Sequence, residues 1–255
     1  MLRKLKRHQF LFEELVKRDF KKKYKGSVLG VGWSLLSPLL MLLVMKVLFT
    51  QFFGRAVENY TTYLFAGLLV FAYFQESSKG GMSSLVGNAA IFTKVNVPKY
   101  LFPLAKNVQA LLNFALTLVV FFVFAYLDGV RFTWKFLLLA YPVCTLFLFN
   151  VGLGLILSAL FVFFRDVQYL WGVALRLIMY GSAVFYTVDQ FPPAMKVLFA
   201  LNPVYDHIAY IRTVVLHGQV PGWELHALLA AFAVGAAVLG GWFYKRYNTE
   251  FLYHV

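Results

Sequence analysis

Two cations interrupt apolar stretches of the sequence, where a charged side chain is costly and commonly functional. Lys46 lies about two thirds of the way along one stretch, and Arg176 lies about nine residues into another. Each has two interpretations. In the first, its side chain extends to the membrane surface and keeps the charge in water. In the second, it faces a central path and binds an anionic substrate. Replacement by methionine distinguishes the two, because only the second predicts a loss of transport.

Motifs that would give the chain its own catalysis or energy supply are absent from the sequence. No Gly-Lys dipeptide occurs, so the phosphate-binding loop G-x-x-x-x-G-K-[ST] is excluded. His207, His217 and Glu224 match no metal-binding or paired-carboxylate pattern. Ion-coupled carriers bury carboxylates near the bilayer midplane, whereas Glu76 lies near the end of its apolar stretch. We therefore expect no catalytic residue, metal site or cofactor on this chain, and an energy source on another chain.

The composition indicates an all-α polytopic membrane protein. Hydrophobic residues make up 61% of the 255 residues and charged residues 14%, against about 25% charged in soluble domains. Several apolar runs reach the roughly 20 residues that cross a bilayer as a helix, and they are continuous rather than alternating, which excludes a barrel. The net charge of +13 is concentrated near one end, which favours anionic lipid over nucleic acid as its partner.

Hydrophobic periodicity divides the chain into three regions. Residues 1–32 form a basic tail and an amphipathic interface helix at about 10–24, residues 33–244 form the membrane domain, and residues 245–255 form a tail. Two pieces at 194–201 and 204–216 are too short to cross and predict an outer re-entrant pair between spans five and six. The six expected spans are residues 33–53, 60–77, 104–127, 134–164, 167–188 and 223–244.

The distribution of positive charge predicts the orientation. Six spans place both termini on one side, and ten Lys and Arg residues precede Trp33. Because positive charge is retained on the cytoplasmic side, we expect both termini in the cytoplasm.

The segment from Arg18 to Pro38 resembles the N-terminal signature of the transmembrane subunits of type-2 ABC exporters for polysaccharides, including O-antigen, capsule and teichoic-acid permeases. Lys94 to Pro98, Phe164-Arg165-Asp166 and Asn202-Pro203 resemble later motifs of that family, so the likeness covers almost the whole chain. The matching positions of the first signature are Arg18, Asp19, Lys21, Tyr24, Lys25, Ser27, Leu29, Gly30, Trp33 and Pro38.

The resemblance implies a homodimer with two separate ATPase subunits, which bind ATP and Mg²⁺. It also implies a substrate built as a glycan or polyol-phosphate polymer on a polyprenyl-pyrophosphate lipid. The residues expected to contact the ATPases are Phe12, Val16, Lys94, Pro98, Arg165 and Asp166. The residues expected along the headgroup and substrate path are Arg18, Lys21, Lys22, Tyr24, Lys25, Trp33, Lys46 and Arg176. Arg18, Lys21, Lys22, Lys23 and Lys25 form a positive ring that suits a pyrophosphate headgroup. This ring has a second interpretation, in which it only fixes topology and binds anionic lipid.

The sequence therefore predicts the channel-forming, non-catalytic subunit of an ATP-driven exporter of lipid-linked polysaccharide or teichoic-acid-like polymer in a bacterial cytoplasmic membrane. The nearest alternative is a type-2 exporter of a small molecule or drug. Two alternatives belong to other classes. A membrane enzyme acting on lipid-linked sugar would need a set of catalytic residues, and the sequence shows none. An ion-coupled carrier would stop transporting when its ion gradient collapses, even in the presence of ATP.

Overall fold

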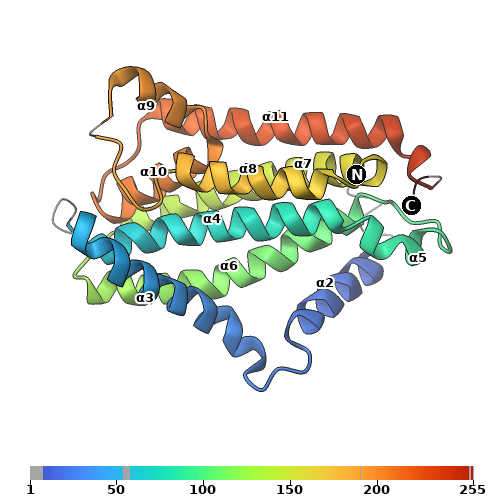
Figure 1. The fold of residues 1–255 in the computed structure, drawn as a ribbon, viewed down its shortest axis with the longest axis horizontal. Helices are drawn as coiled ribbons and strands as arrows, with labels where there is room; N and C mark the ends of the chain where they lie inside the picture. Colours follow the sequence, from blue (N-terminus) through green and yellow to red (C-terminus); the bar gives the residue numbers. More distant parts are fainter. Residues whose placement is uncertain (1–7, 54–57, 190, 253, 255) are drawn as a thin grey trace.

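The computed structural model describes residues 8–53, 58–189, 191–252 and 254, with the side chains of residues 24 and 50–53 excepted. All regular structure in these residues is helical, and the long helices run side by side along one axis (Figure 1). The ten α-helices are α2 (Gln9–Tyr24), α3 (Trp33–Phe53), α4 (Tyr60–Ser83), α5 (Ala89–Phe92), α6 (Leu101–Leu127), α7 (Ala140–Phe163), α8 (Val167–Gly181), α9 (Pro193–Ala200), α10 (Pro203–Val215) and α11 (Trp223–Tyr247). Four short 3₁₀ segments accompany them, η1 (Gly30–Gly32), η2 (Val86–Asn88), η3 (Trp134–Leu139) and η4 (Glu250–Leu252).

Four of the expected spans coincide with helices that are long and apolar enough to cross a membrane. These candidate spans are Gly30–Phe49, Leu101–Leu127, Trp134–Phe163 and Trp223–Tyr247. The second expected span corresponds to α4, whose 24 residues extend about 36 Å at 1.5 Å per residue. The fifth corresponds to α8, whose 15 residues extend only about 22 Å. The count of six spans stays a prediction.

The helix α8 ends seven residues before the expected boundary at residue 188. Ala183 adopts a left-handed backbone with φ of 47°, and the chain then turns back toward α4. The turn is held because Arg212 of α10 donates to the carbonyl oxygens of Ala183 and Val184, both at 2.9 Å. Distant residues therefore set this boundary, and the apolar run itself does not show it.

The helix α4 is the centre of the bundle, and most of its residues are buried between α6 and α7. It continues to Ser83, beyond the expected end at residue 77, through a glycine pair. A Cβ on Gly81 would lie 2.8 Å from the Cα of Gly154, so the small residue permits α4 and α7 to touch along their backbones. The helix α7 meets α11 in the same way, where a Cβ on Gly152 would lie 2.2 Å from the carbonyl carbon of Ala236.

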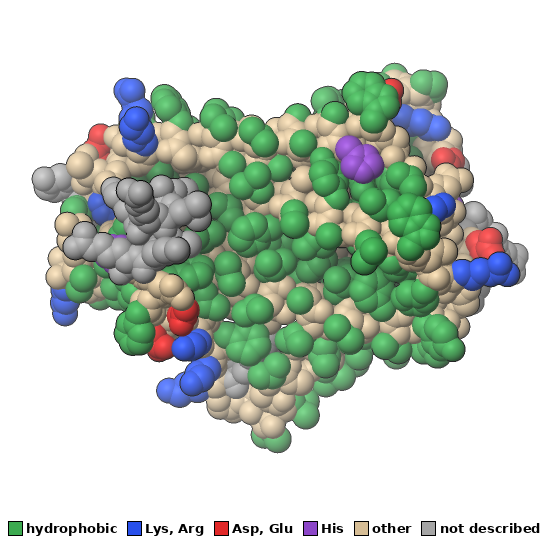
Figure 2. Space-filling model, turned by 180° about the vertical axis from the view of Figure 1, so that it is seen from behind, with side chains coloured by type: hydrophobic (Ala, Val, Ile, Leu, Met, Phe, Trp, Pro, Cys, Tyr) green, Lys and Arg blue, Asp and Glu red, His purple; other side chains and the backbone are tan. Residues whose placement is uncertain are grey.

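The two ends of the bundle differ in composition. We call the end that carries the start of α2, α5 and the end of α11 the base end, and the end that carries α9 and residues 128–133 the far end (Figure 1). On the face seen in Figure 2, hydrophobic side chains cover the middle, whereas Lys, Arg, Asp and Glu gather at the two ends. An apolar belt between charged ends is the pattern expected of a protein that spans a bilayer.

The pair of short helices expected after the fifth span is present as α9 and α10. They meet at Asn202-Pro203. Asn202 caps α10 by accepting from the amide of Val204 at 3.0 Å, and proline at the first helical position needs no amide partner. The same asparagine donates to the carbonyl oxygen of Gly181 at 3.0 Å, which fixes the pair against the end of α8. Their re-entrant position in a membrane stays a prediction.

Candidate substrate cavity and coupling surface

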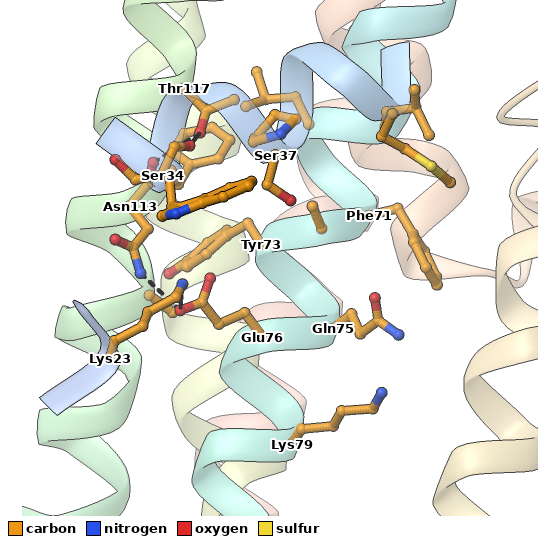
Figure 3. A pocket seen from close by; sticks show the side chains of 18 of the residues that line it. Lys23, Ser34, Ser37, Phe71, Tyr73, Gln75, Glu76, Lys79, Asn113 and Thr117 are labelled. Carbon is orange, nitrogen blue, oxygen red and sulfur yellow. Dashed lines mark hydrogen bonds and ion pairs between the residues drawn. The ribbon is translucent and has the colours of Figure 1, made fainter. Parts of the chain in front are cut away.

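A cavity of about 760 Å³ lies between α3, α4 and α6, and Lys23 of α2 also lines it. Figure 3 shows its polar side chains, which come from all three helices. Trp33 and Met41 of α3 line it and are 41% and 43% exposed, so the cavity is open to the surface along α3. Of the residues expected for the headgroup and the substrate path, Trp33 and Lys23 line this cavity.

An ion pair lies at the end of the cavity where α2 ends. The Lys23 ammonium is 2.7 Å from Oε1 of Glu76, and Asn113 of α6 donates its amide to the same oxygen at 2.7 Å. Figure 3 shows the three side chains converging from three helices. This contact ties the end of α2 to the bundle, because Lys23 is the only one of the three that belongs to α2.

The basic segment of α2 divides into a structural part and an exposed part. Arg18 donates to Asp19 at 2.8 Å and to the side-chain oxygen of Asn88 at 2.6 Å, and Asp19, which is buried, also binds Lys106 of α6 at 3.0 Å. Arg18 is therefore engaged in holding α2 on the bundle. The side chains of Lys21, Lys22 and Lys25, at and just beyond the end of α2, are exposed, and the side chain of Tyr24 lies outside the described residues.

The helices α3 and α8 are the least covered of the long helices. Within α8 only Leu175 is buried, and large apolar side chains such as Val47 and Leu177 are more than 60% exposed. Lys46 and Arg176 lie on these two helices, and both are exposed. Neither lines the cavity, and neither has an ion-pair partner among the described residues. The two interpretations of these cations stay open.

The residues expected to contact the ATPases fall into two groups. Phe12 and Val16 are partly buried and pack on the hydrophobic cluster of the base end, around Leu15 and Phe102. The other group is at the surface of the same end: Lys94, Arg165 and Asp166 are exposed, and Pro98 is partly buried. The outward face of α2 carries charged side chains instead, so an ATPase that approached α2 would meet these first.

The C-terminal tail anchors the segment that carries Lys94 and Pro98. Phe251 of η4 is fully buried, with its ring 5.2 Å from that of Tyr244. The Lys99 ammonium donates to the carbonyl oxygen of Asn248 and lies 5.7 Å from the centre of the Phe251 ring. Burial lowers the pKa of Lys99 below its ordinary value. Lys99 therefore connects the exposed segment at 93–96 to the tail that follows α11.

A second polar cluster closes the far end around Arg212, which is buried in α10. Its guanidinium lies 3.4 Å from the centre of the Tyr63 ring and donates to the carbonyl oxygens of Tyr63, Ala183 and Val184. The hydroxyl of Tyr60 donates to the carbonyl oxygen of Phe185 at 2.9 Å. Residues 183–186 are thus tied to α4 and α10 at several points, which makes the far end a single packed unit.

Sequence reasoning missed the residues that make these contacts. No role was assigned to Arg212 from the sequence, although a single arginine within the short apolar piece at 204–216 is a usable signal for a buried partner. The pair of Lys23 and Glu76 joins residues 53 positions apart, and no local pattern indicates it. No group of three or more His, Cys, Asp or Glu side chains that could hold a metal ion occurs in the described part of the chain.

The sequence is similar to known membrane transport proteins along most of its length. Residues 11–215 match the family model of the ABC-2 type transporter. The chain is 31% identical over 236 residues to the O-antigen export system permease protein RfbA of Myxococcus xanthus, covering 92% of this chain and 91% of the relative. It is 28% identical over 238 residues to an RfbA of Klebsiella pneumoniae, covering 91% and 90%. Identity to the polysialic acid transport protein KpsM of Escherichia coli is 20% over 231 residues, covering 89% and 90%.

Proposed function

Because the chain belongs to the ABC-2 type transporter family, we propose that it is the membrane-spanning subunit of an exporter that moves a lipid-linked polysaccharide out of the cytoplasm. The observation that carries the proposal is the similarity to O-antigen export permeases along nine tenths of both chains. A polyprenyl-pyrophosphate carrier fits the exposed cations Lys21, Lys22 and Lys25, since phosphate groups bind Lys and Arg through charge-assisted hydrogen bonds.

The energy for export comes from two separate ATPase subunits, which hold ATP and Mg²⁺. This chain has no phosphate-binding loop of its own. The surface offered to an ATPase is the base end, where Lys94, Arg165 and Asp166 are exposed. Because the tail and Lys99 hold the segment at 93–96, a push from the ATPase on that segment is transmitted to α11 as a rigid-body movement.

The subunit works as a homodimer with a path between two copies. The exposed apolar faces of α3 and α8 are the surfaces that a second copy or lipid must cover. Lys46 and Arg176 lie on these helices, so a path bounded by them would present cations to an anionic substrate. The protein lies in a bacterial cytoplasmic membrane with α4 and α8 as the second and fifth of six spans and with both termini inside.

Copurification tests the proposal directly. The chain is expressed with an affinity tag in its own host, extracted in mild detergent and examined by mass spectrometry for protein and glycolipid. We expect an ATPase subunit in equal amount and a polyprenyl-linked glycan, and we expect substitution of Arg165 and Asp166 by alanine to reduce the ATPase without reducing the dimer. Substitution of Arg131, which is exposed at the far end, is the matched control. A stable dimer that brings neither ATPase nor glycan contradicts the proposal, and an ATPase with a drug in place of a glycan supports a small-molecule exporter.

A further inference from the structure

We propose that the cavity between α3, α4 and α6 is a binding site for one phosphate-headed amphiphile, and that Glu76 competes with the phosphate for Lys23. The cavity is amphipathic along its length. The stripe that α4 contributes starts with Phe65, Leu68 and Leu69 and ends with Glu76 and Lys79, at helical spacing. A sugar or an inorganic ion would use only the polar end, whereas a single amphiphile would use both.

The dimensions of the cavity fit one leaflet of a membrane. Fourteen residues separate Phe65 from Lys79 on α4, which corresponds to about 21 Å along the helix axis. The hydrocarbon core of a bilayer is about 30 Å thick, so one leaflet with its headgroup has a similar length. Because α4 runs from the far end to the base end, the polar end of the cavity lies where headgroups of the base-side leaflet would lie.

The charged groups at the polar end suit a phosphate. Lys23 and Lys79 lie on either side of Glu76 in Figure 3, and Ser27 and Ser34 are also among the polar residues that line the cavity. The side chains of Lys23 and Glu76 are 37% and 33% exposed, and ion pairs at such positions are worth little. A phosphate can therefore take Lys23 from Glu76 at small cost, which breaks the ion pair between α2 and α4.

The exchange would connect ligand binding to the position of α2. When Lys23 binds Glu76, the end of α2 is connected to α4 at the polar end of the cavity. With Lys23 on a phosphate, that contact is replaced by one to the ligand, so an occupied and an empty cavity hold α2 differently. The identity of the natural ligand as the polyprenyl carrier rests on the proposed function, but binding of a phosphate-headed amphiphile does not.

Binding is measured on the purified full-length chain in neutral detergent, without ATPase or transport, so failure of this inference is separable from failure of the proposed function. The probes are geranylgeranyl phosphate, dioleoyl phosphatidic acid and the neutral geranylgeraniol. The readout is the part of the tryptophan fluorescence that the Trp33→Phe variant removes, because Trp33 lines the cavity. Native mass spectrometry counts the bound molecules.

Substitutions at Lys23 and Glu76 are expected to change the affinity for phosphate in opposite directions. Lys23→Gln is expected to weaken phosphate binding about tenfold, because a charge-assisted hydrogen bond is lost, whereas Glu76→Gln is expected to strengthen it about threefold by removing the competitor. Lys17→Gln is the matched control, since Lys17 is exposed on α2 and pairs with Glu14. Tight binding of the isoprenoid phosphate alone assigns the site to the carrier, and equal binding of both phosphates assigns it to membrane phospholipid. Equal binding of geranylgeraniol, or a Glu76→Gln variant that binds phosphate no better than the wild type while folding normally, overturns the proposal.

Discussion

Replacement of Arg212 by methionine tests whether the far end is one packed unit. The guanidinium makes four hydrogen bonds to three backbone carbonyls, and methionine of similar length makes none. The carbonyls of Ala183 and Val184 then lose these donors in a buried region, at about 1–3 kcal/mol each. Part of this cost is offset because the variant no longer buries a charge. We expect a net loss of about 3 kcal/mol in the free energy of unfolding.

The assay is thermal unfolding of the purified chain in one detergent, followed by tryptophan fluorescence and size exclusion. About 3 kcal/mol corresponds to a fall of about 10 °C in Tm for a chain of this size. Arg212→Lys keeps the charge but lacks the planar fork that donates to three carbonyls. Its Tm is therefore expected between those of the wild type and Arg212→Met. Arg131→Met removes an exposed arginine at the same end and is expected to change Tm by less than about 1 °C. Equal Tm values for Arg212→Met and Arg131→Met would refute the reasoning.

Three further substitutions test other contacts of the fold. Gly240→Ala places a Cβ 2.4 Å from a carbonyl oxygen of α7 and is expected to lower Tm by more than about 5 °C. The control is Gly241→Ala, which is expected to leave Tm unchanged because nothing lies within 4 Å of the added Cβ. Equal Tm values for the two variants would contradict the packing of α7 on α11. Phe251→Ala empties a buried site at a cost of about 3 kcal/mol and is expected to speed tryptic cleavage in the segment at 93–99, and an unchanged cleavage rate would show that the tail does not hold that segment. Asp128 caps the start of α4 by accepting a hydrogen bond from the amide of Thr62 at 2.9 Å. Asp128→Ala removes this acceptor, so amide hydrogen exchange in the first turn of α4 should become faster by the equivalent of about 1 kcal/mol. Slower or equal exchange would contradict this capping role.

The parts of the fold that could be predicted are those set by local sequence. Apolar length alone predicts α3, α6, α7 and α11, since a bilayer requires about 20 apolar residues. The break between α9 and α10 is equally local, because Asn202 supplies a cap and Pro203 starts a helix.

The parts that could not be predicted depend on contacts between distant residues. Residues 182–188 are mostly apolar and read as the rest of a span, but Arg212 supplies the hydrogen bonds that let the chain leave α8 at Gly181. Gly80 and Gly81 lie beyond the expected end of the second span at residue 77, but Gly81 is helical because α7 packs directly against it.

The candidate site shows the same division. The amphipathic pattern of α2 predicts an apolar face at Phe12 and Val16, but periodicity does not say what that face contacts, and the structure places it on the bundle. Trp33 belongs to a motif that the sequence shows, and the structure places it in the lining of the cavity. The pairing of Lys23 with Glu76 could not be predicted, because it depends on how α2 packs on the bundle. The roles of the exposed cations at the base end stay predictions.

The most direct test of the account is ATP-driven export in inverted membrane vesicles that contain this chain and its ATPase. Lipid-linked glycan on the outer surface of such vesicles is open to a membrane-impermeant glycosidase until it is moved into the lumen. The account predicts that ATP makes the glycan resistant, that an ionophore leaves this protection intact, and that vesicles lacking this chain show none. Glycan that stays fully sensitive with ATP, or protection that disappears when the ion gradient collapses, would contradict the central claim.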